Sequence, residues 1–193
     1  MKEVVFYYDF RSPYAYFASQ RLKVITSKGA NVVWKPVSID VLLNLQADRD
    51  PWAEYVDPLV PAKRAHLVAD VGRMAAYWKI PLKRPQPPRP RSKEAMSIAT
   101  LLAEAGIEHA AFRNNAFAAL WQNQKDLGDS EVYQAAVGDI DWQTFGTLSN
   151  GLERLSQNTL TAYARGVYGV PTFVVDDHLY FGADRMGVLA NNL

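Results

Sequence analysis

The first sixteen residues place an apolar run directly before a helix start. Val4-Val5-Phe6-Tyr7-Tyr8 contains only β-branched and aromatic residues, which predicts a buried strand. Pro13 suits the first helical position, because the N–H that it lacks would be unpaired there and its φ angle is already helical. Ser12 then lies at the N-cap, where free N–H groups and the helix dipole favour an anion. An ordinary serine cap is the alternative interpretation.

The remaining elements follow in a definite order. A helix over residues 13–28 and a strand at 32–34 complete a strand–helix–strand unit, whose strands we expect to be parallel with a right-handed crossover. Asp57-Pro58 indicates a loop, and the five prolines of residues 81–91 predict an extended connector. The chain returns to strands at 170–175 and 178–181 before a closing helix from residue 182. Helical patterns occupy residues 39–45, 61–78, 93–105, 109–124, 130–136, 141–147 and 151–165.

This order predicts an α/β fold, namely a thioredoxin-like βαβ…ββα domain with a large all-helical insertion. We expect residues 1–37 and about 150–193 to form the thioredoxin-like domain. Residues from about 38 to 150 would then form the helical insertion.

Composition narrows the possible functions. The net charge of +1 gives no field that attracts nucleic acid or a membrane surface, and no apolar run approaches the ~20 residues of a membrane span. The N-terminus reads as a strand rather than a signal peptide, so a cytoplasmic protein is expected. The sequence contains no cysteine, which excludes disulfides and any dithiol of its own. His66, His109 and His178 have no metal-ligand spacing, so no metal site is expected.

Three segments carry a strong resemblance to a known family, and a fourth carries a weaker one. Residues 8–16 (YDFRSPYAY) resemble the D-F-x-S-P-Y-x-Y motif of 2-hydroxychromene-2-carboxylate isomerases. These enzymes are glutathione-dependent relatives of kappa-class glutathione transferases, in the DsbA-like branch of the thioredoxin superfamily. Residues 166–175 (GVYGVPTFVV) resemble the second family motif, and residues 181–186 (FGADRM) resemble the third. Residues 60–64 (VPAKR) resemble a weaker fourth motif, so the resemblance spans the whole chain.

The resemblance implies a catalytic role for Ser12. Redox relatives begin this helix with C-P-x-C, whereas residues 12–15 here are Ser-Pro-Tyr-Ala. The dithiol is lost, but a helix N-terminus can still stabilise the thiolate of a separate molecule, and glutathione is the obvious candidate. A hydrogen bond from the Ser12 Oγ–H to the sulfur would lower the thiol pKa from its reference of ~8.5.

The resemblance also implies which residues bind glutathione. Val170–Pro171 is expected to be a cis peptide, with the backbone of Val170 paired to the cysteinyl part; a proline that merely begins a strand is the alternative. Ala183 and Asp184 are expected to receive the γ-glutamyl end, with the Asp184 carboxylate on its ammonium, although Asp184 can also be read as a helix cap. Lys63 can meet the glycyl carboxylate or lie in solvent.

One stretch departs from the family pattern. Many members carry Asn-Pro-Pro upstream of P-A-K, and the asparagine contacts glutathione, whereas this chain has Asp50-Pro51-Trp52. The resemblance therefore assigns no glutathione-binding residue to residues 50–52. A carboxylate substrate also needs a cation, for which Lys63, Arg11 and the basic run at residues 83–91 are available.

The implied activity is a glutathione-dependent isomerase of aromatic compound degradation. It would interconvert 2-hydroxychromene-2-carboxylate, or a polycyclic analogue, and trans-o-hydroxybenzylidenepyruvate. The expected partners are a small aromatic carboxylate and, as a homodimer, a second copy of the chain. A kappa-type glutathione transferase is the nearest alternative. A thioredoxin-fold binding module that catalyses nothing is an alternative of another class.

Overall fold

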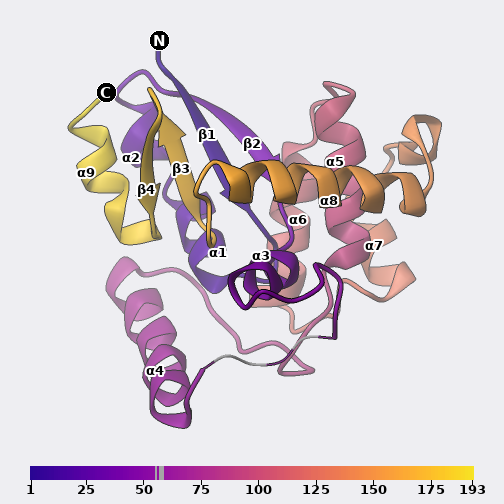
Figure 1. Ribbon diagram of the computed structural model, residues 1–193, viewed down its shortest axis with the longest axis horizontal. Coiled ribbons are helices and arrows are strands. Elements are labelled where there is room, and N and C mark those ends of the chain that lie inside the picture. Colours follow the sequence, from indigo (N-terminus) through magenta and orange to yellow (C-terminus); the bar gives the residue numbers. More distant parts are fainter. Residues whose placement is uncertain (55, 57–58) are drawn as a thin grey trace.

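A four-stranded sheet in the order β2-β1-β3-β4 forms the centre of the computed structural model, which describes residues 1–54, 56 and 59–193 (Figure 1). β1 (Glu3–Tyr8) runs parallel to β2 (Asn31–Pro36). β3 (Thr172–Val175) is antiparallel to β1, and β4 (His178–Phe181) returns beside β3 as a hairpin. This topology confirms the predicted thioredoxin-like arrangement of strands. The predicted turn at Asp57-Pro58 lies outside the described residues.

The helices follow the predicted order with two corrections. The single helix expected over residues 13–28 is wrong, because the Arg21 N–H donates to Ala18 O three residues back, at 3.0 Å, and ends the first helix. The helix expected over residues 141–147 is a short 3-10 helix that stops at Gly146, whose φ is 141°. The α-helices are α1 (Pro13–Gln20), α2 (Lys23–Thr26), α3 (Ile39–Gln46), α4 (Pro61–Trp78), α5 (Lys93–Glu104), α6 (Ala110–Trp121), α7 (Ser130–Val137), α8 (Leu148–Ala164) and α9 (Met186–Ala190), and the 3-10 helices are η1 (Trp142–Phe145) and η2 (Ala183–Arg185).

The two faces of β1 are buried against different helices, because successive side chains of a strand point to opposite sides. Phe6 and Tyr8 are fully buried in the larger core, which also holds Phe112 and Phe117 of α6. Tyr7 points the other way, into a smaller core that includes side chains of α3 and α8. Burying an aromatic or aliphatic side chain of this size contributes roughly 1.5–3 kcal/mol, so both faces fix the position of β1. The Ser12 loop follows directly from this strand.

The larger core contains side chains of both the thioredoxin-like segments and the helical segment. Phe10 from the loop after β1 contacts Phe112 and Phe117, with ring centroids 5.7 and 5.1 Å apart. Residues from about 38 to 150 nevertheless contribute only helices and connections among the residues described. We therefore propose that they form an insertion whose core is shared with the thioredoxin-like part.

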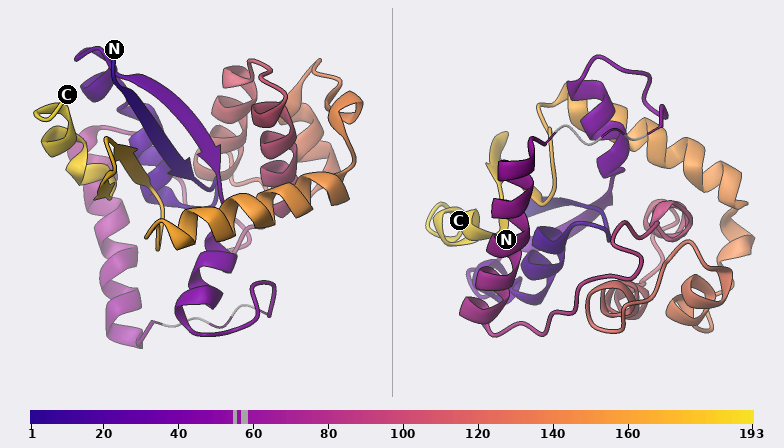
Figure 2. Two further views of the ribbon diagram at one scale, coloured as in Figure 1. Left: turned by 45° about the horizontal axis from the view of Figure 1, so that its top comes forward. Right: turned by 90° about the horizontal axis from the view of Figure 1, so that it is seen from below.

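α4 extends away from the sheet, with its first turn at the outer end and its last turn near α1 (Figures 1 and 2). Ala75 is its one buried residue. A side-chain hydrogen bond ties the helix to α1, since the Tyr14 hydroxyl donates to Asp70 Oδ2 at 2.8 Å. Among the residues described, no helix has both the length and the apolar character needed to cross a membrane.

Candidate active site

Ser12 is the N-cap of α1, as the sequence predicts. Its backbone is extended (φ −83°, ψ 118°), and its Oγ accepts a hydrogen bond from the Ala15 N–H at 3.1 Å. Pro13 occupies the first helical position. The same hydroxyl donates to the carbonyl oxygen of Val170 at 3.1 Å, across 158 residues of chain. Ser12 and Val170, which were predicted from two separate motifs, are therefore in direct contact.

The Val170–Pro171 peptide is cis and lies just before β3. The carbonyl of Pro171 accepts from the Gly182 N–H at 2.9 Å, which joins this loop to the end of β4. Val170 is largely buried, and the described residues give its N–H no hydrogen-bond acceptor. Because buried backbone donors are nearly always paired, this N–H is suited to the backbone carbonyl of an extended peptide.

Asp184 lies in η2, directly after β4, with its side chain 56% exposed. Its Oδ2 pairs with Arg185 Nη1 at 3.0 Å, and Gly182 rather than Asp184 occupies the N-cap position of η2. Gly182 allows this geometry, because a Cβ at that residue would lie 2.5 Å from Asp184 Oδ1 and its φ is 104°. The carboxylate therefore remains available to a ligand ammonium group.

Ala183 is connected to α1 by an arginine that the sequence analysis did not single out. Arg21 Nη1 donates to the carbonyl of Ala183 at 2.8 Å, and the guanidinium lies 4.0 Å from the ring centroid of Trp78. Burial lowers the pKa of Arg21, and the charge of Asp184 opposes that effect. The contact fixes η2 against the end of α1, on whose N-terminus Ser12 lies.

Lys63 is the one predicted site residue that no described contact joins to the other five. It is exposed on the first turn of α4, the end of that helix farthest from the sheet (Figure 1). Its proposed contact with a glycyl carboxylate stays a prediction.

Asp9 organises the loop that presents Ser12. Its Oδ1 accepts from the Arg11 N–H at 2.9 Å and from the Ser92 hydroxyl at 2.8 Å, and its Oδ2 accepts from the Ile39 N–H at 2.9 Å. The carboxylate thus joins the Ser12 loop to the starts of α3 and α5. Burial raises the pKa of Asp9, while the charge of Arg11 and these hydrogen bonds oppose the increase.

Asp9→Asn is expected to lower the free energy of unfolding at pH 7 by about 1–2 kcal/mol, because an amide nitrogen cannot accept from the N–H groups that Asp9 binds. Burial raises the pKa of Asp9, so the folded chain holds this proton more tightly than the unfolded chain. The wild type therefore loses stability relative to the variant as pH rises from about 4. Urea denaturation at pH 4 and pH 7 measures both effects, with the exposed Asp139→Asn as control. A stability difference that grows with pH would contradict this assignment.

The fold and site can be compared with known proteins. A family model described as "DSBA-like thioredoxin domain" matches residues 3–193, so the chain belongs to this family. The 2-hydroxychromene-2-carboxylate isomerase of Sphingobium xenophagum is 26% identical over 198 residues, which cover 100% of this chain and 98% of that protein. Glutathione S-transferase kappa 1 of Caenorhabditis elegans is 25% identical, over 100% of this chain and 91% of that protein.

A solved structure supports the same family relationship. The structure of selenomethionine 2-hydroxychromene-2-carboxylate isomerase superposes with a TM-score of 0.73 at 25% identity, covering 98% of this chain and 93% of that one. The resemblance recognised from the motifs is thereby confirmed. The relatives of this chain include named isomerases and a kappa-class glutathione transferase.

Proposed function

We propose that this protein is a glutathione-dependent isomerase acting on 2-hydroxychromene-2-carboxylate or a polycyclic analogue. The observation that carries the proposal is the Ser12 hydroxyl, which caps α1 and meets Val170 where redox relatives would have a cysteine. With no cysteine in the chain, the site has a place for a thiolate but no thiol of its own. The names of the relatives support both the reaction and the thiol.

The residues at the site fit glutathione. The Val170 N–H, which has no acceptor among the described residues, suits the cysteinyl backbone, and the exposed Asp184 carboxylate suits the γ-glutamyl ammonium. When bound, glutathione supplies a thiolate that adds to a conjugated enone and leaves again, so that the former double bond can rotate in between.

Ser12 has two tasks in this proposal. Its hydroxyl hydrogen turns from Val170 O toward the sulfur, because a thiolate is a charged and therefore stronger acceptor than a carbonyl oxygen. Its position at the N-terminus of α1 adds the free N–H groups of the first turn, which favour negative charge. Both effects lower the pKa of a thiol bound there.

The test is to incubate the purified protein with trans-o-hydroxybenzylidenepyruvate, with and without glutathione, and to follow both the substrate absorbance and the free thiol. We expect interconversion that requires glutathione and leaves its concentration unchanged. Stoichiometric loss of thiol would instead identify a kappa-type transferase, to which the C. elegans relative points. Absence of glutathione binding by calorimetry would leave the non-catalytic binding module.

A further inference from the structure

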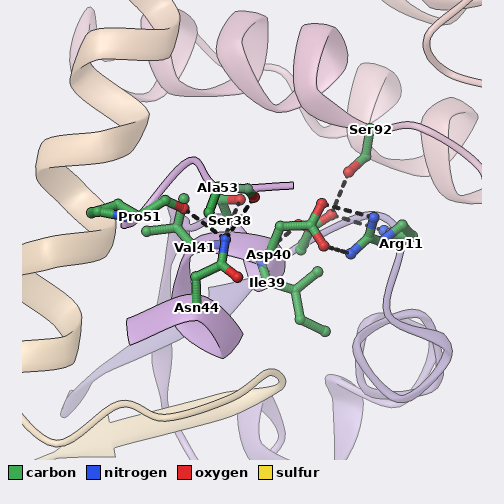
Figure 3. A network of polar contacts seen from close by, with 10 residues as sticks. Arg11, Ser38, Ile39, Asp40, Val41, Asn44, Pro51, Ala53 and Ser92 are labelled. Atoms are coloured by element: carbon green, nitrogen blue, oxygen red, sulfur yellow. Dashed lines mark hydrogen bonds and ion pairs between the residues drawn. The ribbon is translucent and has the colours of Figure 1, made fainter. Parts of the chain in front are cut away.

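A cavity of about 240 Å³ lies beside the Ser12 loop. One wall is formed by Arg11 and Asp40, whose side chains make a paired ionic contact (Figure 3). The opposite walls come from residues 51–53 and from the start of α5, including Lys93 and Glu94. The volume is below the roughly 300–1,000 Å³ of sites for drug-sized ligands, so an occupant must be small. Of the functional residues predicted from the sequence, Arg11 and Arg91 of the basic run line this cavity.

Trp52 is held as a fixed aromatic wall of the cavity. Its Nε1–H donates to Ser156 Oγ of α8 at 2.8 Å. The amide of Asn44 donates to the carbonyls of both neighbours of Trp52, Pro51 at 3.1 Å and Ala53 at 2.9 Å (Figure 3). The loop in which the chain departs from the family motif is therefore anchored to α3 and α8, although the Trp52 side chain is 38% exposed.

Lys93 is a cation of the cavity that no carboxylate neutralises among the described residues. Its Nζ lies 4.9 Å from the ring centroid of Trp52. By contrast, Arg11 pairs with Asp40, and Arg91 donates to Asp126 Oδ2 at 3.0 Å. An ammonium group above an aromatic ring can bind a carboxylate whose apolar part packs on the same ring.

Glu94 supplies a hydrogen-bond acceptor beside this cation. It also lines the cavity, and its buried Oε2 finds no hydrogen-bond donor in the part of the chain that the structure describes. A ligand that is only an anion would be repelled by this carboxylate. A ligand that brings a hydroxyl group would instead donate to it.

We propose that this cavity binds the second substrate as an aromatic hydroxy acid. The carboxylate binds Lys93 Nζ, the ring packs on Trp52, and the hydroxyl donates to Glu94. Arg11, the residue before Ser12, lines the same cavity, so the cavity lies beside the loop that presents Ser12. The assignment of this molecule as substrate rests on the proposed function, whereas its binding does not require glutathione.

The probe is 2-hydroxycinnamate, titrated by calorimetry into the glutathione-free protein. Lys93→Gln is expected to weaken its binding about tenfold or more, the size of a lost charge-assisted hydrogen bond. Lys83→Gln removes the same charge from the basic run at residues 83–91 and should leave binding unchanged. Cinnamate, which lacks the hydroxyl, should bind the wild type more weakly than 2-hydroxycinnamate.

Three results would overturn the assignment: no binding by the wild type, equal binding by Lys93→Gln, or a loss in Lys83→Gln instead. Failure of the proposed function would give a different pattern of results from failure of the cavity assignment. Lys93-dependent binding of 2-hydroxycinnamate without glutathione-dependent turnover would leave the cavity assignment intact and reject the isomerase. Glutathione-dependent turnover with an unchanged KM in Lys93→Gln would reject the cavity assignment alone.

Discussion

Ser12→Ala is expected to reduce kcat/KM for isomerisation about 100-fold or more while changing the Kd for glutathione much less. Loss of one positioned donor to a developing or stabilised anion typically costs this much. The effect falls on turnover because the hydroxyl acts chiefly on the charged form of the thiol. The fold should survive, since removing a helix cap costs only ~1 kcal/mol.

The measurement combines isomerase kinetics with ultraviolet titration of the bound thiolate in both proteins. The variant should show a higher pKa for the bound thiol. Ser19→Ala on the same helix is the matched control, because among the described residues the Ser19 hydroxyl bonds to Tyr16 O, at 2.7 Å, and to the Gln20 amide, both on or next to its own helix turn. Wild-type turnover and an unchanged thiol pKa in Ser12→Ala would reduce Ser12 to a helix cap.

Asp184→Ala is expected to weaken glutathione binding by about tenfold to a hundredfold, the scale of a hydrogen bond to a charged group. The physical reason is the loss of the carboxylate that we propose to pair with the γ-glutamyl ammonium. Its ion pair with Arg185 is exposed, so the variant should keep nearly the stability of the wild type. Asp177→Ala in the hairpin turn removes the same charge outside the site and is the control.

Calorimetry with two ligands separates a direct contact from a general change of charge. Glutaryl-cysteinylglycine lacks the γ-glutamyl amino group and should bind the wild type more weakly than glutathione does. Asp184→Ala should bind the two peptides with similar affinity, because the interaction that distinguishes them is already lost. If the variant still preferred glutathione by the wild-type factor, the ammonium would bind elsewhere.

The parts of the site that depend on local geometry could be predicted from the sequence. Ser12 and Pro13 are adjacent, so their roles as N-cap and first helical residue follow from the preferences of a helix start. The parallel pairing of β1 with β2 likewise follows from one strand–helix–strand segment. The break at Arg21 could not be predicted from the local pattern, because residues 14–28 contain neither proline nor glycine. The contact of the Arg21 side chain with Ala183, 162 residues away, could not be predicted either.

The contacts that hold the site in place could not be predicted either, because they join residues that are far apart in the sequence. Asp9 belongs to the first motif, but its partners Ile39 and Ser92 begin two distant helices, and no spacing in the sequence joins them. Lys93 and Trp52 lie on either side of the prolines of residues 81–91, and only the folded chain brings them together. The signal for Asp9 in the sequence was its place as the first residue of the D-F-x-S-P-Y-x-Y motif.

In the proposed function, the bond between the Ser12 hydroxyl and Val170 O means that a bound thiolate must replace the carbonyl oxygen as hydrogen-bond acceptor. A hydroxyl carries one hydrogen, so it cannot donate to the carbonyl and to a sulfur at the same time. The hydroxyl hydrogen leaves the carbonyl oxygen only for a stronger hydrogen-bond acceptor than an amide carbonyl, and a thiolate is such an acceptor. A peptide with serine in place of cysteine would leave the internal bond in place, so the resting site discriminates by acceptor charge before shape is considered.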